Sequence, residues 1–260
     1  AAKVRVKLYD GRVKYQGSPH LVEGPAVQLD RIGKKLWVGV VAVDIPPGTA
    51  PGRELGYDLL LEDSEGEHGL FRLGLLGGTA AAVGGQWDQR RARMPLGHED
   101  GYLPSFALPA AHPKDLRVVH ASCRKPHGGG EKEGDALQMV DAAIKDAVLG
   151  SGLVAKANRP QQLFLTGDQI YADDVAGGLL AALTEAGERL LGWDEQMPGL
   201  DPLLDWLIDP GWRTRFLSMK DIGLKDKAPT EGTDYSANHL LRFGEWVAMY
   251  VFAWSDALWA

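Results

Sequence analysis

Hydrophobic and polar residues alternate along much of the first hundred positions. In KVRVKLYD the apolar residues Val4, Val6 and Leu8 alternate with basic ones, which is the period of two of a strand that buries one face. Similar short apolar segments follow, separated by the turn-forming stretches IPPGTAPG and EDSEGEHG; they are KLWVGVVAVD, YDLLLED and GLFRLGLL. No helical periodicity of useful length interrupts them. The pattern predicts an antiparallel, all-β sandwich domain over residues 1–112.

The pattern changes after the proline-containing segment SFALPAAHPKD, which is typical of a linker. RVVHA predicts a short strand, and the apolar residues of GDALQMVDAAIKDAVLG recur at helical intervals between a candidate N-cap, Asp135, and a candidate stop, Gly150. The strand QLFL follows. This order predicts a βαβ unit with neighbouring parallel strands, and hence an α/β domain over 116–260. Further helices are expected at 175–191, at PLLDWLI and from Ala237 towards the C-terminus.

Composition and charge exclude several classes of function. The chain has 260 residues, 45% of them hydrophobic, and a formal net charge of -7 with a pI near 5.5. It is long enough to bury one or two cores, and its acidity argues against nucleic acid or an anionic membrane as the main partner. The apolar run WVAMYVFAWSDALWA is shorter than a membrane span and contains Ser255 and Asp256, so it predicts a buried helix. No signal-peptide pattern is visible at the start, which favours a cytoplasmic location; the sequence sets no oligomeric state.

Candidate ligands follow the two predicted parallel strands. Cys123, which is the single cysteine, comes after the first strand; Asp168, in GDQIYADD, comes after the second, with Tyr171 three residues on. The carboxyl ends of neighbouring parallel strands meet at one sheet edge, where ligands collect. A phenolate ligand favours a highly charged cation such as Fe³⁺, and no paired Cys or His at zinc spacing occurs. Each residue also has an ordinary explanation: a small buried thiol, a turn-shaping carboxylate and a core aromatic.

Neighbouring residues are open to two interpretations each. Arg124 has a fork of donors suited to a substrate phosphate, or to a surface salt bridge. His127 lines a pocket or binds nothing. Asp173 and Asp174 orient metal ligands or cap the helix that follows, and the cap is favoured.

The segments HASCRKPHGG and LFLTGDQIYADDV together resemble the PhoD-like (alkaline phosphatase D) metallophosphatases of the calcineurin-like superfamily. The resemblance covers roughly residues 117–260 and implies an incomplete calcineurin-like α/β domain. It implies Cys123, Asp168 and Tyr171 as iron ligands, with Asp168 bridging to a second, divalent ion such as Ca²⁺. The implied activity is two-metal hydrolysis of a small-molecule phosphate ester, with Asp168 and Arg124 as candidate catalytic residues.

Two departures from that family change the expectation. Asn238 and His239 are similar to its asparagine–histidine pair, but Ala237 stands where a glycine usually precedes the pair, and the segment has a helical pattern. The remaining ligands of the family lie on later strands that this sequence does not contain. We therefore expect the chain to be the N-terminal part of a longer protein and to be inactive by itself.

Two other functions compete with the phosphoesterase. One is a binding or scaffolding protein with a degenerate metallophosphatase domain. The other is a carbohydrate-binding module, which rests on the eight tryptophans alone. Six of these lie in the predicted helical half, where core packing is the expected role.

Overall fold

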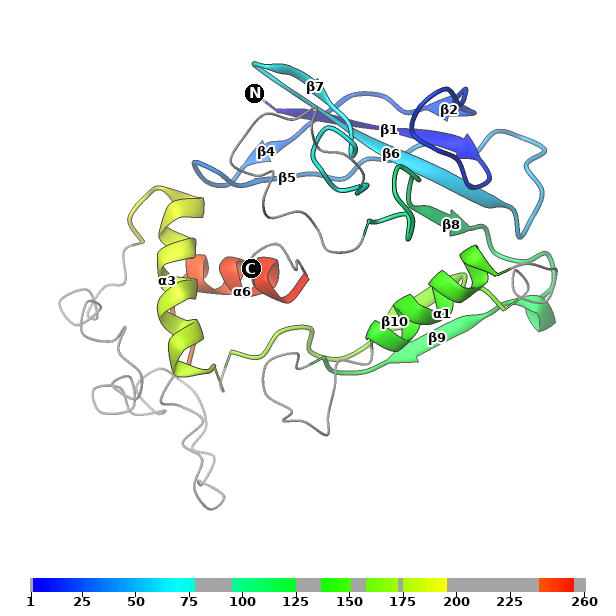
Figure 1. The fold of residues 1–260 in the computed structure, drawn as a ribbon. Coiled ribbons are helices and arrows are strands. Elements are labelled where there is room, and N and C mark those ends of the chain that lie inside the picture. The colour runs from blue at the N-terminus through cyan, green and yellow to red at the C-terminus, as the bar shows by residue number, and fades with distance from the viewer. Residues whose placement is uncertain are drawn as a thin grey trace.

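The chain is a mixed α/β protein with antiparallel sheets in its first half and a parallel strand pair and helices in its second (Figure 1). The computed structural model describes residues 2–77, 95–124, 137–150, 158–172, 175–195 and 239–254. Predictions for Asp135, Asp173, Asp174 and PLLDWLI lie outside these residues.

Strands β1 (Lys3–Asp10) and β6 (Glu54–Asp63) form the centre of a six-stranded antiparallel sheet. They pair along the whole of β1, from Lys3 opposite Glu62 to Asp10 opposite Leu55. The four shorter strands of the sheet are β2 (Val22–Glu23), β3 (Val27–Gln28), β7 (Gly66–His68) and β8 (Ser105–Ala107). The side chains of Val4, Val6 and Leu8 are buried, which confirms the predicted alternation.

Two of the predicted strands are wrong. In KLWVGVVAVD only β5 (Trp37–Val38) is a strand, and it pairs with β4 (Asp30–Arg31) in a separate hairpin. GLFRLGLL forms successive turns instead of a strand. There the Asp58 carboxylate accepts the N–H of Leu70 at 2.9 Å, and Gly74 adopts a φ of +77°. Side-chain and local turn hydrogen bonds thus take the amides that a strand would have paired.

The expected linker begins later than its composition indicates. Ser105–Ala107 is strand β8, which pairs with β6, and the N–H of Leu108 still bonds to the carbonyl of Arg53 at 2.8 Å. A short 3₁₀ turn, η3 (Pro113–Asp115), then leads to the second half.

The predicted βαβ unit is present. Strand β9 (Val118–Ala121) leads to helix α1 (Leu137–Leu149) and then to strand β10 (Gln162–Leu165). The strands are parallel neighbours, with Val118 opposite Gln162 and Ala121 opposite Leu165. The N–H of Gly150 bonds to the Asp146 carbonyl at 2.8 Å where α1 ends.

Helices α3 (Gly177–Leu191) and α6 (Phe243–Trp254) cross and pack against one another (Figure 1). Their buried core consists of Val175, Leu180, Leu183, Leu240, Ala248 and Met249. The backbones come closest where Gly187 meets Gly244. Glycines at both positions are what permits such a close approach.

Helix α6 begins at Phe243, later than predicted. The N–H groups of its first two residues, Phe243 and Gly244, donate to the Glu195 carboxylate. The N–H groups of the two residues before the helix, Leu241 and Arg242, donate to the Glu245 carboxylate. These carboxylates bind the N–H groups at the start of α6, so the helix begins at Phe243.

Only one face of α6 is buried, so the prediction of a buried helix is wrong for the other face. Four large side chains are substantially exposed, at 39–51%: Phe243, Trp246, Tyr250 and Trp254. Trp193, after α3, is also 48% exposed, which contradicts a core role for the described tryptophans of this half. Among the described residues, none of the helices is both long and apolar enough to cross a membrane.

A buried arginine joins the two halves. Arg159, which precedes β10, is 6% exposed and donates to Glu54 Oε1 at 2.5 Å, to Ser105 Oγ at 3.0 Å and to the Ser105 carbonyl at 2.5 Å. Ser105 Oγ in turn donates to Glu54 Oε1 at 2.8 Å. The start of β10 is therefore fixed to strands β6 and β8.

Candidate functional site

The loops that follow β9 and β10 run side by side at the carboxyl edge of the strand pair. The N–H of Thr166 bonds to the carbonyl of Ala121 at 3.0 Å, and the N–H of Arg124 bonds to the carbonyl of Asp168 at 2.6 Å. The hydrogen-bonded ladder thus continues beyond the strands. Cys123 and Asp168 therefore emerge at the same edge, as the parallel arrangement predicts.

Gly167 allows the two loops to approach closely. A Cβ at this position would lie 2.6 Å from the Cys123 sulfur and 2.7 Å from its backbone nitrogen. No side chain fits in that space. The glycine before Asp168 is therefore required by the position of Cys123.

The Cys123 thiol lies among hydrogen-bond donors. It is exposed, and hydrogen bonds from the hydroxyls of Tyr171 and Ser122 and from the N–H of Asp168 lower its pKa. The Ser122 oxygen lies 3.7 Å from the sulfur. The negative charge of Asp168 acts in the opposite direction and raises the pKa, without outweighing the donors. Thiol, carboxylate and phenol hence share one small region.

Sequence reasoning missed Gln169. Its side-chain amide donates to the carbonyls of Ser122 at 3.1 Å and Gly167 at 2.8 Å. It thereby ties the loop after β9 to the loop after β10. Within GDQIYADD this residue gave no chemical signal, because a glutamine beside an aspartate has no distinctive pattern.

No protein-family model matches this chain, no curated protein matches it, and no solved structure matches it.

The three side chains at this edge are of types that bind metal ions in proteins. The described residues contain no group of three or more His, Cys, Asp and Glu side chains suited to a metal ion. Cys123 and Asp168 are two residues of these types, and Tyr171, whose type is outside that set, hydrogen-bonds to the Cys123 thiol from the loop that carries Asp168.

The structure places only some of the other candidate residues near this edge. Arg124 is at the edge, beside Cys123, and its guanidinium carbon lies 4.6 Å from the centre of the Trp254 ring. His239 lies outside α6, and its Nδ1 is 2.6 Å from the carbonyl oxygen of Leu240; the helical prediction for it is wrong. His127, Asp173, Asp174 and Asn238 lie outside the described residues.

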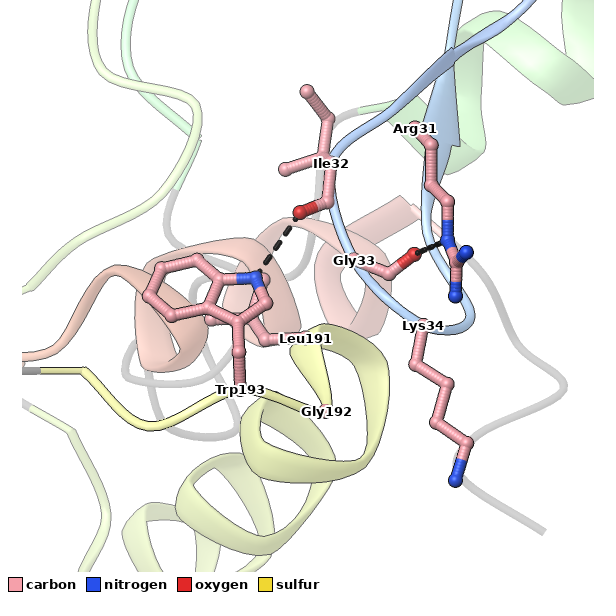
Figure 2. Close-up of a pocket in the computed structure, with 7 residues that line it drawn as sticks. All are labelled: Arg31, Ile32, Gly33, Lys34, Leu191, Gly192 and Trp193. Carbon is pink, nitrogen blue, oxygen red and sulfur yellow. Dashed lines mark hydrogen bonds between the residues drawn. The ribbon is translucent and has the colours of Figure 1, made fainter.

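A concave region lies where the β4–β5 turn meets the end of α3. This crevice, of about 460 Å³, is lined by Arg31, Ile32, Gly33, Lys34, Leu191, Gly192 and Trp193 (Figure 2). The Trp193 indole N–H bonds to the Ile32 carbonyl at 3.1 Å. Figure 2 shows the charged side chains of Arg31 and Lys34 extending away from this indole, so they do not converge on a common ligand.

The crevice is a structural junction. The N–H groups of Lys34 and Lys35 bond to the carbonyls of Leu191 and Leu190 at 2.6 and 2.9 Å. They cap the last turn of α3, whose carbonyls have no partner within the helix. The turn thus holds α3 against the N-terminal half.

Proposed function

We propose that this chain contributes to a metal-dependent phosphoesterase site of the PhoD-like kind, in which Cys123, Asp168 and Tyr171 hold iron. The observation that carries the proposal is the convergence of a thiol, a carboxylate and a phenol at the carboxyl edge of two parallel strands. In the same proposal, the antiparallel N-terminal half is a β-sandwich, and the second half is part of a calcineurin-like domain.

The chemistry of the donor set fits a ferric ion. Three ligands that can each carry a negative charge would offset a trivalent cation. The lowered pKa of the Cys123 thiol favours the thiolate, which is the form that binds metal. The proposal requires further ligands for a two-metal centre, and these must come from outside the described residues.

Bound iron together with a divalent ion such as Ca²⁺ would supply Lewis acidity and a water-derived nucleophile for phosphate-ester hydrolysis. The residues of the chain prepare the site for that reaction. Asp168 presents an exposed carboxylate for two ions to share, and its backbone N–H and carbonyl hold Cys123 and Arg124 in place. Arg124 presents donors for the phosphate oxygens of the substrate.

Asp168→Asn tests the proposal. The full-length protein that carries this sequence is loaded with iron, and bound metal and hydrolysis of p-nitrophenyl phosphate are measured. The variant should lose metal and lose activity by at least about 100-fold, because charge stabilisation and nucleophile generation both depend on the ions. Cys123→Ser and Tyr171→Phe should weaken iron binding as well. The matched control is Asp194→Asn, an exposed aspartate after α3, which should change neither quantity.

The rival function, a non-catalytic scaffold, gives a different result. A wild-type protein that binds no iron and hydrolyses no phosphate ester supports the scaffold. Normal metal content and activity in Asp168→Asn would show that Asp168 only shapes the loop.

A further inference from the structure

Trp254 reaches the candidate site from a third element of the fold. It is in the last turn of α6, and its ring lies against the guanidinium of Arg124, whose Cζ is 4.6 Å from the ring centre. Arg124 directly follows Cys123 and is bonded through its backbone to Asp168. Helix α6 thus contributes to the edge that carries the thiol and the carboxylate.

Core packing does not account for this position of Trp254. Its side chain is 47% exposed, whereas Ala248, Met249 and Ala253 supply the buried face of the helix. The ring of Trp254 instead contacts the guanidinium of Arg124. Such a contact is attractive, because the face of an indole carries the negative part of its quadrupole.

The position of the guanidinium over the ring suits the binding of an oxyanion. A ring that contacts the face of a guanidinium leaves the N–H donors, which lie in the guanidinium plane, for other partners. Two of those donors match two oxygens of a phosphate. A ring that fixes the plane in advance also reduces the side-chain freedom lost when the anion binds.

We propose that Trp254 is a positioning residue that holds the Arg124 guanidinium to bind the phosphate group of the substrate beside Cys123 and Asp168. The naming of the anion as a substrate phosphate rests on the function proposed above. The pairing itself rests on the contact between α6 and the loop after β9.

The test compares Trp254→Leu, Trp254→Phe, Arg124→Ala and the double variant Trp254→Leu/Arg124→Ala in the iron-loaded full-length protein. The measurements are the Kd of inorganic phosphate, kcat and KM for p-nitrophenyl phosphate, and bound iron. Trp246→Leu is the control, since Trp246 is an exposed tryptophan of the same helix.

We expect Trp254→Leu to raise the phosphate Kd and the KM about 5- to 20-fold, the range of a cation–π contact that is partly desolvated. Trp254→Phe should retain most of the affinity because an aromatic face remains. The double variant should be no weaker than Arg124→Ala, because the tryptophan acts through the arginine. Iron content and the Trp246→Leu control should be unchanged.

Each failure has its own signature. Independent, multiplicative losses in the double variant, or a wild-type Kd and KM in Trp254→Leu, would overturn the positioning role while the phosphoesterase stands. Phosphate binding that depends on Arg124 and Trp254 in a protein without turnover would support the pair and overturn the proposed function. A wild-type protein that neither binds phosphate nor hydrolyses the ester would overturn both.

Discussion

The close contact between α3 and α6 makes Gly187→Ala a sharp test of the packing. A Cβ at Gly187 would lie 2.5 Å from the carbonyl carbon of Gly244 and 2.6 Å from its oxygen. The obstacle is helix backbone, which has no rotamer by which to move aside. The two helices must therefore separate to admit the methyl group.

The destabilisation expected from Gly187→Ala follows from these short distances. Unstrained carbon contacts are about 3.5–4.0 Å, so the helices must move apart by about 1 Å, which forfeits part of the dispersion energy of the core around Leu183 and Met249. Overpacking and loosened contacts together cost about 3–4 kcal/mol, and the better helix propensity of alanine returns about 1 kcal/mol. We expect a net loss of about 2–3 kcal/mol in the free energy of unfolding.

Gly178, on the same helix, is the matched control. No atom outside its own local backbone lies within 4 Å of a Cβ placed there, so Gly178→Ala should stabilise the protein by about 0.5 kcal/mol through helix propensity and reduced freedom of the unfolded chain. Urea unfolding followed by circular dichroism measures both variants. Equal midpoints for the two would refute the close packing of α3 on α6.

Three further predictions concern charges and hydrogen bonds. Burial raises the pKa of the Asp58 carboxyl group, so this group holds its proton more tightly in the folded state than in the unfolded state. The free energy of unfolding should therefore fall as pH rises from about 4 through the folded pKa. Asp58→Asn should reduce this pH dependence, measured by urea unfolding at several pH values. Arg159→Met leaves Glu54 without its buried arginine partner and should lower the free energy of unfolding, measured in urea, by about 3 kcal/mol. A decrease below about 0.5 kcal/mol would contradict a stabilising role for this ion pair. In metal-free protein Tyr171→Phe removes a donor to the thiolate, so the pH midpoint for iodoacetamide alkylation of Cys123 should move upward; an unchanged midpoint would place the phenol elsewhere.

The local pattern of hydrophobic and polar residues predicted much of the secondary structure. Strands β1 and β6 were predictable because alternation reports burial of one sheet face, and the β9–α1–β10 unit because short strands flanking a helical pattern favour parallel pairing. The common edge of Cys123 and Asp168 followed from that pairing. These features depend on residues close in sequence and on one general rule of sheet topology.

Contacts between distant residues set the rest. The start of α6 depends on Glu195, which lies far from the helix in sequence and accepts two of its first amides. GLFRLGLL has the composition of a strand, but the Asp58 carboxylate and local turns take its amides. The contact between Trp254 and Arg124 likewise has no local sequence signal. Hydrophobic pattern alone could not predict any of these.

The N-terminal half supports the candidate site through two junctions. Arg159 fixes the start of β10, whose other end leads to Asp168, and β10 pairs with β9, which leads to Cys123. The turn at 31–35 caps α3, and α3 packs against α6, which presents Trp254 to Arg124. Every element that supplies a site residue is therefore connected, directly or through one neighbour, to the antiparallel half. A freely attached carbohydrate-binding module would not need such connections, so they favour a sheet that maintains the geometry of the site.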